Sequence, residues 1–243
     1  MPTATRTAAP YAGKTGKAER TRALILDTAL AMVRERGYDR ATMRAIAEEA
    51  GLSLGSAYYY FPSKEHLIQA FYARSHAEHL AACDPILASE STLEARLLGV
   101  LAAKFDTSRD DHPFAAALFR TAADPGSPLS PFSSESMETR DQAVALMARV
   151  VEGAQIEVEP SLAPVLPGLL WLYQMGLILF WVHDRSPDQA RSYRLMEHTC
   201  RIVCSAIRLA NIPLVRPLVR ATVTLMHELQ SPDFQATPAR GES

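Results

Sequence analysis

The sequence predicts an all-α protein, and three observations favour that class. No stretch alternates apolar and polar residues for more than a few positions, so no half-buried strand is expected. Apolar residues instead recur three or four positions apart through most of the 243 residues. Between Thr42 and Tyr60, the chain predicts two short helices separated by a tight glycine turn.

Residues with clear local roles delimit these two helices. The Thr42 hydroxyl can accept a first-turn N–H, which starts a helix over residues 43–50. Gly51 ends that helix, because glycine adopts positive φ without strain. Ser53 caps the second helix, and Pro62 prevents its continuation. The arrangement is a helix-turn-helix, whose second helix enters the DNA major groove.

The second short helix suits a polyanion. Residues 54–60 contain no carboxylate, and Gly55 and Ser56 permit close approach of a nucleic acid. Three consecutive tyrosines and the downstream Lys64 provide donors for phosphate oxygens. On the first short helix, Arg44 can make a bidentate contact with guanine.

Several motifs follow one another in register: Arg36-Gly37-Tyr38, Thr42-x-Arg44-x-Ile46-Ala47, Ala50-Gly51-Leu52-Ser53, Gly55, and Tyr58-Tyr59-Tyr60-Phe61-x-Ser63-Lys64-Glu65-x-Leu67. Over about residues 21–71, they resemble the DNA-binding signature of the TetR (tetracycline-repressor) family. Tyr60 departs from the signature, since many members carry His there, but tyrosine can also bond a phosphate.

The resemblance implies which residues contact DNA and which lie in the hydrophobic core. It implies that Ile46, Ala47 and Phe61 are mainly core residues. It implies DNA contacts from ten residues: Thr42, Arg44, Ser53, Leu54, Gly55, Ser56, Tyr58, Tyr59, Tyr60 and Lys64.

Resemblance and composition together divide the chain into four parts. Residues 1–17 are rich in Thr, Ala, Pro and Gly and are expected to form a disordered arm. Residues 18–63 would form the three-helix DNA-binding domain, and residues 64–230 an α-helical ligand-binding and dimerisation domain. Residues 231–243 would form a flexible tail. Basic residues at the first junction fit either a solvated helix start or an arm near phosphates: Lys14, Lys17, Arg20 and Arg22.

Charge and cysteine content are consistent with a cytoplasmic DNA-binding protein. Residues 1–75 carry 11 Lys+Arg and 7 Asp+Glu, whereas the remainder carries 14 and 20. A positive first part on a negative body orients the protein towards a polyanion. Three cysteines without paired spacing favour a reducing compartment over a disulfide framework. The first residues lack the apolar run of a signal peptide.

A membrane span, a metal site and a hydrolase active site are each considered and not favoured. Residues 160–182 are uncharged and very apolar, but prolines break the first part, and the rest is short for a membrane span. His76, His79 and Cys83 share a helix face, but a polar stripe is favoured over a metal site. The pattern Gly51-x-Ser53-x-Gly55 matches a hydrolase elbow, but a predicted helix precedes it where a strand is required. We therefore expect no enzyme activity, metal or cofactor.

The last third of the chain predicts an association surface. Residues 188–210 carry two apolar stripes, which suggests that this helix faces both its own core and another subunit. With the apolar helix 168–182, it is similar to the helix pair that forms a four-helix dimer interface in the family. The expected homodimer residues are Phe180, Met196, Cys200, Val203 and Ile207. Helices are also expected over about residues 64–82 and 113–122, and a further amphipathic helix, 216–230, is expected to cover the body.

The resemblance also implies a small-molecule cavity in the helical body. Aromatic and methionine side chains offer apolar walls, and Arg120 and Gln174 offer polar anchors, although any one of them can equally be core. The candidate ligand-binding residues are Phe71, Tyr72, Phe105, Phe114, Phe119, Arg120, Met137, Trp171, Tyr173, Gln174 and Met175. The sequence thus favours a homodimeric repressor that binds palindromic DNA and is released by a hydrophobic effector. The alternative is a small-molecule-binding or interaction protein with secondary DNA binding.

Overall fold

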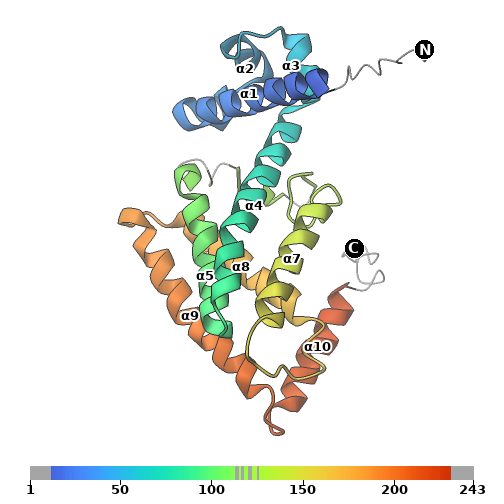
Figure 1. Cartoon of the computed structure of the whole chain (residues 1–243), viewed down its shortest axis with the longest axis vertical. Coiled ribbons are helices and arrows are strands. Elements are labelled where there is room, and N and C mark those ends of the chain that lie inside the picture. The colour runs from blue at the N-terminus through green and yellow to red at the C-terminus, as the bar shows by residue number, and fades with distance from the viewer. Residues whose placement is uncertain (1–11, 113–114, 116–117, 120–121, 125, 231–243) are drawn as a thin grey trace, which may run out of the picture. The chain divides into compact units, whose positions relative to one another are not determined.

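The computed structural model describes residues 12–112, 115, 118–119, 122–124 and 126–230, and it confirms the all-α class (Figure 1). Within these residues, helices are the only regular structure. The α-helices are α1 (Ala12–Arg36), α2 (Met43–Glu49), α3 (Leu54–Tyr60), α4 (Lys64–Ser89), α5 (Leu93–Thr107), α7 (Met137–Glu152), α8 (Leu166–His183), α9 (Ala190–Leu209) and α10 (Arg216–Gln230). Three short 3₁₀ segments join them: η1 (Tyr38–Arg40), η2 (Arg109–Asp111) and η3 (Pro187–Gln189). The short helix predicted near residues 113–122 lies partly outside the described residues.

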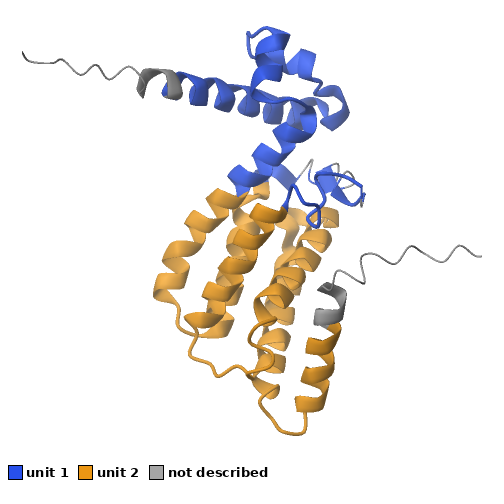
Figure 2. Cartoon of the chain, turned by 90° about the vertical axis from the view of Figure 1, so that its right-hand side faces the viewer, with its two compact units in different colours: residues 1–75, 110–136 blue, residues 76–109, 137–243 orange. Residues whose placement is uncertain are grey.

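The chain forms two compact units, which Figure 2 colours separately. Unit 1 comprises residues 1–75 and 110–136, and unit 2 comprises residues 76–109 and 137–243. Helix α4 is one continuous helix that belongs to unit 1 up to Ser75 and to unit 2 from His76.

Two helix boundaries differ from the sequence prediction. Helix α1 begins at Ala12, so residues 12–17, which were expected to be disordered, are helical. The last proline before it is Pro10, and nothing from Ala12 onward prevents helical φ and ψ angles. Helix α4 continues to Ser89 through Pro85, whereas it was predicted to end near Ala82. Proline disfavours this position but can be tolerated at the cost of one backbone hydrogen bond.

Unit 1 is a small core built around the first helices. Ile25 and Met32 of α1 pack with Ile46 of α2, Phe61 after α3 and Leu67 of α4, and all five are at most 2% exposed. Leu118, Ala122 and Leu129 join the same cluster from the later segment. The predicted core residues Ile46, Ala47 and Phe61 are therefore confirmed as buried.

Unit 2 is a layered packing of α5, α7, α8 and α9 around aliphatic side chains. Leu97 and Val100 of α5, Met147 of α7 and Leu170 of α8 are almost completely buried. Arg96 is also buried, and its guanidinium donates to the carbonyls of Leu87 and Glu90 at the end of α4 and of Arg149 and Val150 at the end of α7. A cation there complements the exposed carbonyls of two helix C-termini.

By length and composition alone, α8 is apolar enough to cross a membrane. Its inward face packs instead in unit 2, where Leu166, Leu170, Trp171, Leu177 and Trp181 are buried. Such a helix is also typical of the interior of a globular domain.

Candidate nucleic-acid interface and effector residues

The turn between α2 and α3 is fixed by backbone hydrogen bonds. The Thr42 hydroxyl accepts from the amide of Ala45 at 3.3 Å, which caps α2. At its other end, the amide of Gly51 donates to Glu48 and the amide of Leu52 donates to Ala47. This is the Schellman pattern, and it requires the positive φ of +67° that Gly51 adopts. The turn therefore helps to set the direction in which α3 leaves α2.

Helix α3 is short, and Gly55, Tyr58 and Tyr59 are its exposed residues. Ser53 caps it by accepting from the amide of Ser56 at 3.1 Å. Its small inward residue, Ala57, is fully buried, which allows α3 to approach the unit 1 core closely. Phe61 adopts an extended conformation and ends the helix before Pro62.

The outward residues offer donors without nearby carboxylates on α3. Tyr59 is 81% exposed and Tyr58 is 46% exposed. The Tyr60 ring packs edge-on against Tyr59, with ring centroids 5.2 Å apart. Arg44 on α2 is exposed and makes no hydrogen bond or ion pair with any described residue. It is therefore available to an external acceptor.

Lys64 has an internal partner that the sequence did not reveal. Its ammonium donates to the carbonyl oxygen of Tyr38 and lies 3.5 Å from the centroid of the Tyr38 ring. Burial lowers the pKa of Lys64, although nearby Asp39 and Glu65 oppose this effect. The side chain thus ties the start of α4 to η1. A similar contact places the Arg22 guanidinium 4.8 Å from the Phe61 ring centroid.

The predicted DNA-binding residues lie together on one short segment of unit 1. Thr42, Arg44, Ser53, Gly55, Tyr58 and Tyr59 are exposed, whereas Leu54, Ser56, Tyr60 and Lys64 are half-buried. The exposed set combines an arginine, hydroxyl groups and a glycine, which suits contact with phosphates and base edges.

The predicted effector residues are distributed over both units. In unit 1, Phe71 is buried in the core, Tyr72 lies 5.7 Å from it by ring centroids, and Phe119 is half-buried. In unit 2, Phe105 stacks on Trp181 at 5.6 Å. Phe114 and Arg120 lie outside the described residues.

Helix α8 points its predicted residues in different directions. Trp171 and Gln174 are buried on its inward face. Tyr173 faces α9, and its hydroxyl lies 2.6 Å from the Thr199 hydroxyl. Met175 is half-buried, and Met137 of α7 is 52% exposed. Met137 therefore has the least enclosed position of the candidates.

The buried polar atoms of unit 2 that lack hydrogen-bond partners among the described residues include one on α8 and one on α4. They are Oε1 of Gln174 on α8 and Nε2 of His76 on α4. Both side chains are more than nine-tenths buried, so each unpaired atom costs free energy unless something else bonds it.

The face with His76, His79 and Cys83 is buried rather than solvated. His79 Nε2 lies 2.9 Å from the carbonyl oxygen of Val100 on α5. Burial, with a contribution from Lys104, lowers the pKa of His79 to about 4, and burial raises the pKa of the Cys83 thiol to about 12. No cluster of three metal-ligating side chains occurs in the described part of the chain. These groups are neutral at pH 7 and stay within the core.

The two apolar stripes of α9 face different ways. Three of the residues predicted at the dimer interface, Met196, Cys200 and Ile207, are at most 5% exposed because they pack into the core of their own unit. They offer little surface to a partner. Val203 is half-buried, and Phe180 on α8 is 41% exposed.

The outward faces of α8 and α9 carry other apolar residues. Leu172 and Leu179 of α8 are 37% and 44% exposed, and Ile202 and Leu209 of α9 are 66% and 50% exposed. Gly176 lies between the two leucines of α8 and has no atom within 4 Å of the position of a Cβ. A second helix can approach closely at such a position.

Comparison with known families gives matches along most of the chain. The family described as bacterial regulatory proteins, tetR family, matches residues 25–71. The tetracyclin repressor-like C-terminal domain matches residues 96–225, which is more than half of the chain.

Individual relatives match over shorter stretches. The HTH-type transcriptional repressor KstR of Rhodococcus jostii is 48% identical over 50 residues, which is 21% of this chain and 24% of that protein. The fatty acid metabolism regulator protein of Bacillus subtilis is 25% identical over 91 residues, 37% of this chain and 47% of that protein. The chain thus spans less than half the length of these curated relatives.

Solved structures share the fold. A tetR-family transcriptional regulator from Streptomyces coelicolor superposes with a TM-score of 0.59 at 23% identity, covering 89% of this chain and 94% of that one. Thermus thermophilus FadR, a TetR-family repressor solved in complex with lauroyl-CoA, superposes with a TM-score of 0.56 at 19% identity. The match covers 74% of this chain and 93% of that one. At these identities, the likeness concerns the fold.

Proposed function

Because the chain belongs to the TetR family of transcriptional regulators, we propose that it is a DNA-binding repressor in the cytoplasm. The observation that carries the proposal is the capped α2–turn–α3 unit, with Arg44 and Tyr59 exposed and no carboxylate on α3. The family model of bacterial regulatory proteins, tetR family, matches residues 25–71, which include this unit.

We propose that two chains bind one palindromic site. The outward faces of α8 and α9 supply the association surface, with Leu172, Leu179 and Phe180 on α8 and Ile202 and Leu209 on α9. A twofold axis then presents two copies of α3 to half-sites about one helical turn apart.

The DNA contacts divide into base readers and phosphate contacts. Arg44 is proposed to read a guanine, and the hydroxyls of Tyr58 and Tyr59 to contact phosphates. Lys64, which holds Tyr38, is proposed to position the start of α4 as well as to add positive charge.

Selection of bound sequences from a random DNA pool tests this function. Inverted repeats should be enriched. Arg44→Ala should relax base preference at one position in each half-site, by about 1–3 kcal/mol. Arg194→Ala, an exposed arginine of α9, removes the same charge from unit 2 and is the control. Enrichment without inverted repeats, or equal effects of the two variants, would contradict the proposal.

We further propose that a hydrophobic effector binds in unit 2 against the inward face of α8. Trp171 and Gln174 are buried there, and the unpaired Oε1 of Gln174 would accept a hydrogen bond from the effector. Thermus FadR, solved with lauroyl-CoA, is a precedent for a TetR-family repressor that binds a lipophilic compound. Binding would shift the population of α4 tilts, so that two recognition helices no longer match both half-sites.

The effector proposal has its own test. A panel of lipophilic compounds that includes lauroyl-CoA is screened for release of the selected DNA and for a change in tryptophan fluorescence over the same concentration range. Gln174→Leu should keep DNA binding and lose the response, because a leucine cannot accept a hydrogen bond. A full response from this variant would refute the role of Gln174.

A further inference from the structure

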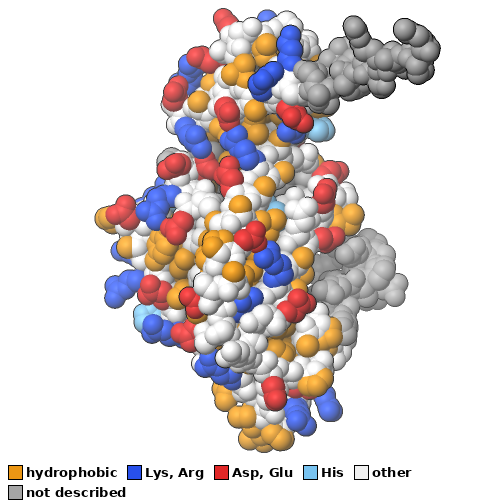
Figure 3. All heavy atoms as spheres, in the orientation of Figure 1, with side chains coloured by type: hydrophobic (Ala, Val, Ile, Leu, Met, Phe, Trp, Pro, Cys, Tyr) orange, Lys and Arg blue, Asp and Glu red, His pale blue; other side chains and the backbone are white. Residues whose placement is uncertain are grey.

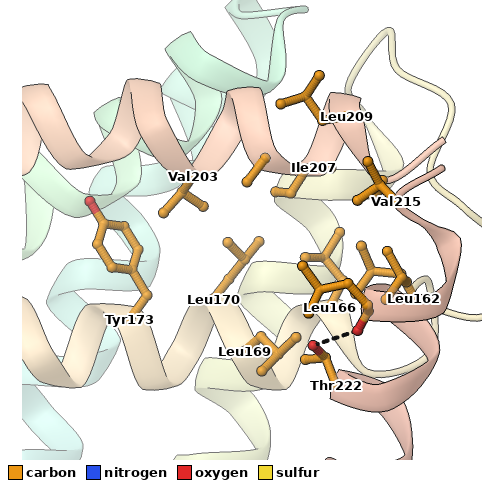
Figure 4. Close-up of a pocket in the computed structure, with 14 residues that line it drawn as sticks. Leu162, Leu166, Leu169, Leu170, Tyr173, Val203, Ile207, Leu209, Val215 and Thr222 are labelled. Atoms are coloured by element: carbon orange, nitrogen blue, oxygen red, sulfur yellow. Dashed lines mark hydrogen bonds between the residues drawn. The ribbon is translucent and has the colours of Figure 1, made fainter. Parts of the chain in front are cut away.

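Helices α8, α9 and α10 enclose an apolar hollow of about 480 Å³ (Figure 4). All of its walls belong to unit 2. Helix α8 contributes Leu166 and Leu170, α9 contributes Ile207, and these three form buried walls with exposures of at most 5%. Helix α10 contributes Leu218, Val219 and Thr222, and Val215 lies in the turn just before it.

The lining carries no charged side chain. Only Tyr173 and Thr222 bring polar atoms, and both hydroxyls already have partners. Thr222 donates to the Leu218 carbonyl at 3.1 Å, and the Tyr173 hydroxyl lies 2.6 Å from that of Thr199. A charged molecule would lose its hydration here without compensation, so the hollow suits a neutral, apolar molecule.

The lining residues run along α8 and α9 to the turn between α9 and α10. Figure 4 shows Tyr173 at one end and Leu162 and Val215 at the other, where the turn from α9 to α10 lies. A helix with its side chains is about 10–12 Å wide. An aliphatic chain is much narrower and can follow the hollow from Tyr173 to the turn.

The surroundings of the hollow are also apolar. Leu209 and Leu218, which line it, are 50% and 69% exposed. Ile212 and Leu214 in the α9–α10 turn are 43% and 89% exposed, and Figure 3 shows apolar side chains gathered at that end of unit 2. An occupant that contacts Leu218 would therefore bury apolar surface that is now in water.

We propose that this hollow is a ligand site for a neutral molecule with an aliphatic chain, separate from the effector site proposed on the inward face of α8. An apolar cavity of about 150 Å³ holds benzene, so this volume suits roughly a dozen carbons or more. The occupant would bridge α10 to α8 and α9, the two helices proposed to associate. The site does not depend on the proposed DNA-binding function.

The test uses the full chain and the probe 1-decanol, a neutral ten-carbon alcohol. Calorimetric titration should show one site per chain and a negative heat-capacity change, as expected for burial of apolar surface. Ala206, a small lining residue, provides the blocking variant. Ala206→Phe should fill the hollow and raise the Kd for 1-decanol roughly tenfold or more.

A matched control is Ala221→Phe, because Ala221 is exposed on α10 and is not part of the lining. It should bind 1-decanol as the unmodified chain does. Far-UV circular dichroism establishes that both variants are folded. A photoreactive decanol carrying a diazirine should label peptides within residues 203–222, which contain the α9 and α10 walls of the hollow but neither Trp171 nor Gln174, and this locates the site even if Ala206→Phe does not fold.

Several results would overturn the proposal: no binding up to the solubility limit, equal binding by Ala206→Phe, or labelling confined to other residues. A fourth is that Ala206→Phe shifts the monomer–dimer equilibrium while 1-decanol does not bind, which would assign the hollow to a second copy of the chain. The 1-decanol titration contains no DNA, so its outcome does not depend on whether the chain binds an operator.

Discussion

Arg96 lies inside unit 2 at 5% exposure, and its guanidinium donates to four backbone carbonyls at the ends of α4 and α7. The N–O distances are 2.9 Å to Val150 and 2.7 Å to Leu87, Glu90 and Arg149. We expect Arg96→Met to be strongly destabilising, because methionine fills part of the space but donates nothing to these carbonyls.

The loss of unfolding free energy in Arg96→Met depends on which of the four hydrogen bonds are buried. The bonds to Val150 and Leu87 are buried, whereas those to Glu90 and Arg149 are partly exposed, so water can replace the latter two. Hydrogen bonds from a charged donor contribute about 1.5–3 kcal/mol each, so losing two buried ones costs about 3–6 kcal/mol. For a chain of this length, the melting temperature should fall by roughly 6–24 °C.

Arg149→Met is a matched control on the same pair of helices. The Arg149 side chain bonds Asp84 of α4 at 2.7 Å, but the two side chains are 47% and 63% exposed. Exposed ion pairs contribute about 0–1 kcal/mol. Urea unfolding followed by circular dichroism, at one protomer concentration, measures both variants. Equal losses of unfolding free energy would refute the assignment of Arg96 as the buried clamp.

Three further predictions concern stability. A Cβ added at Gly153 would lie 2.1 Å from Nη2 of Arg96, so Gly153→Ala should lower the free energy of unfolding by about 1–3 kcal/mol. The loss should be much smaller when Arg96 is already methionine. Urea unfolding of the single and double variants measures this, and additive losses would contradict the prediction. Gly51→Ala should lower the free energy of unfolding by about 1–2 kcal/mol because Gly51 has a φ of +67°. Gly55→Ala should not destabilise the protein, because Gly55 lies inside α3 with open space around it. Thermal melts compare the two variants. The pKa of His79 is about 4 in the folded chain and 6.5 in the unfolded one, so the unfolded state binds more protons between these values. Stability should be complete above pH 6.5 and fall by up to about 3 kcal/mol towards pH 4, and an equally steep fall in His79→Gln would exclude His79 as the source.

Local sequence determined much of the DNA-binding segment. Thr42 and Ser53 cap their helices as expected, and Gly51 makes the turn, because these effects depend on residues within one helical turn of each other. The bounds of α10 also match the prediction, since Pro213 and an amphipathic pattern define them locally. The residues proposed to contact DNA follow from the same segment and its family signature.

Only the tertiary structure decided the remaining features. The sequence showed two apolar stripes on α9, but packing against α5 determines that Met196 and Cys200 face inward and Ile202 faces outward. The partner of Lys64 is 26 residues away in sequence, and Arg96 bonds carbonyls up to 54 residues away. The hollow among α8, α9 and α10 likewise depends on where α10 packs. Helical periodicity tells which residues share a face, whereas the contacts made by that face depend on segments distant in the chain.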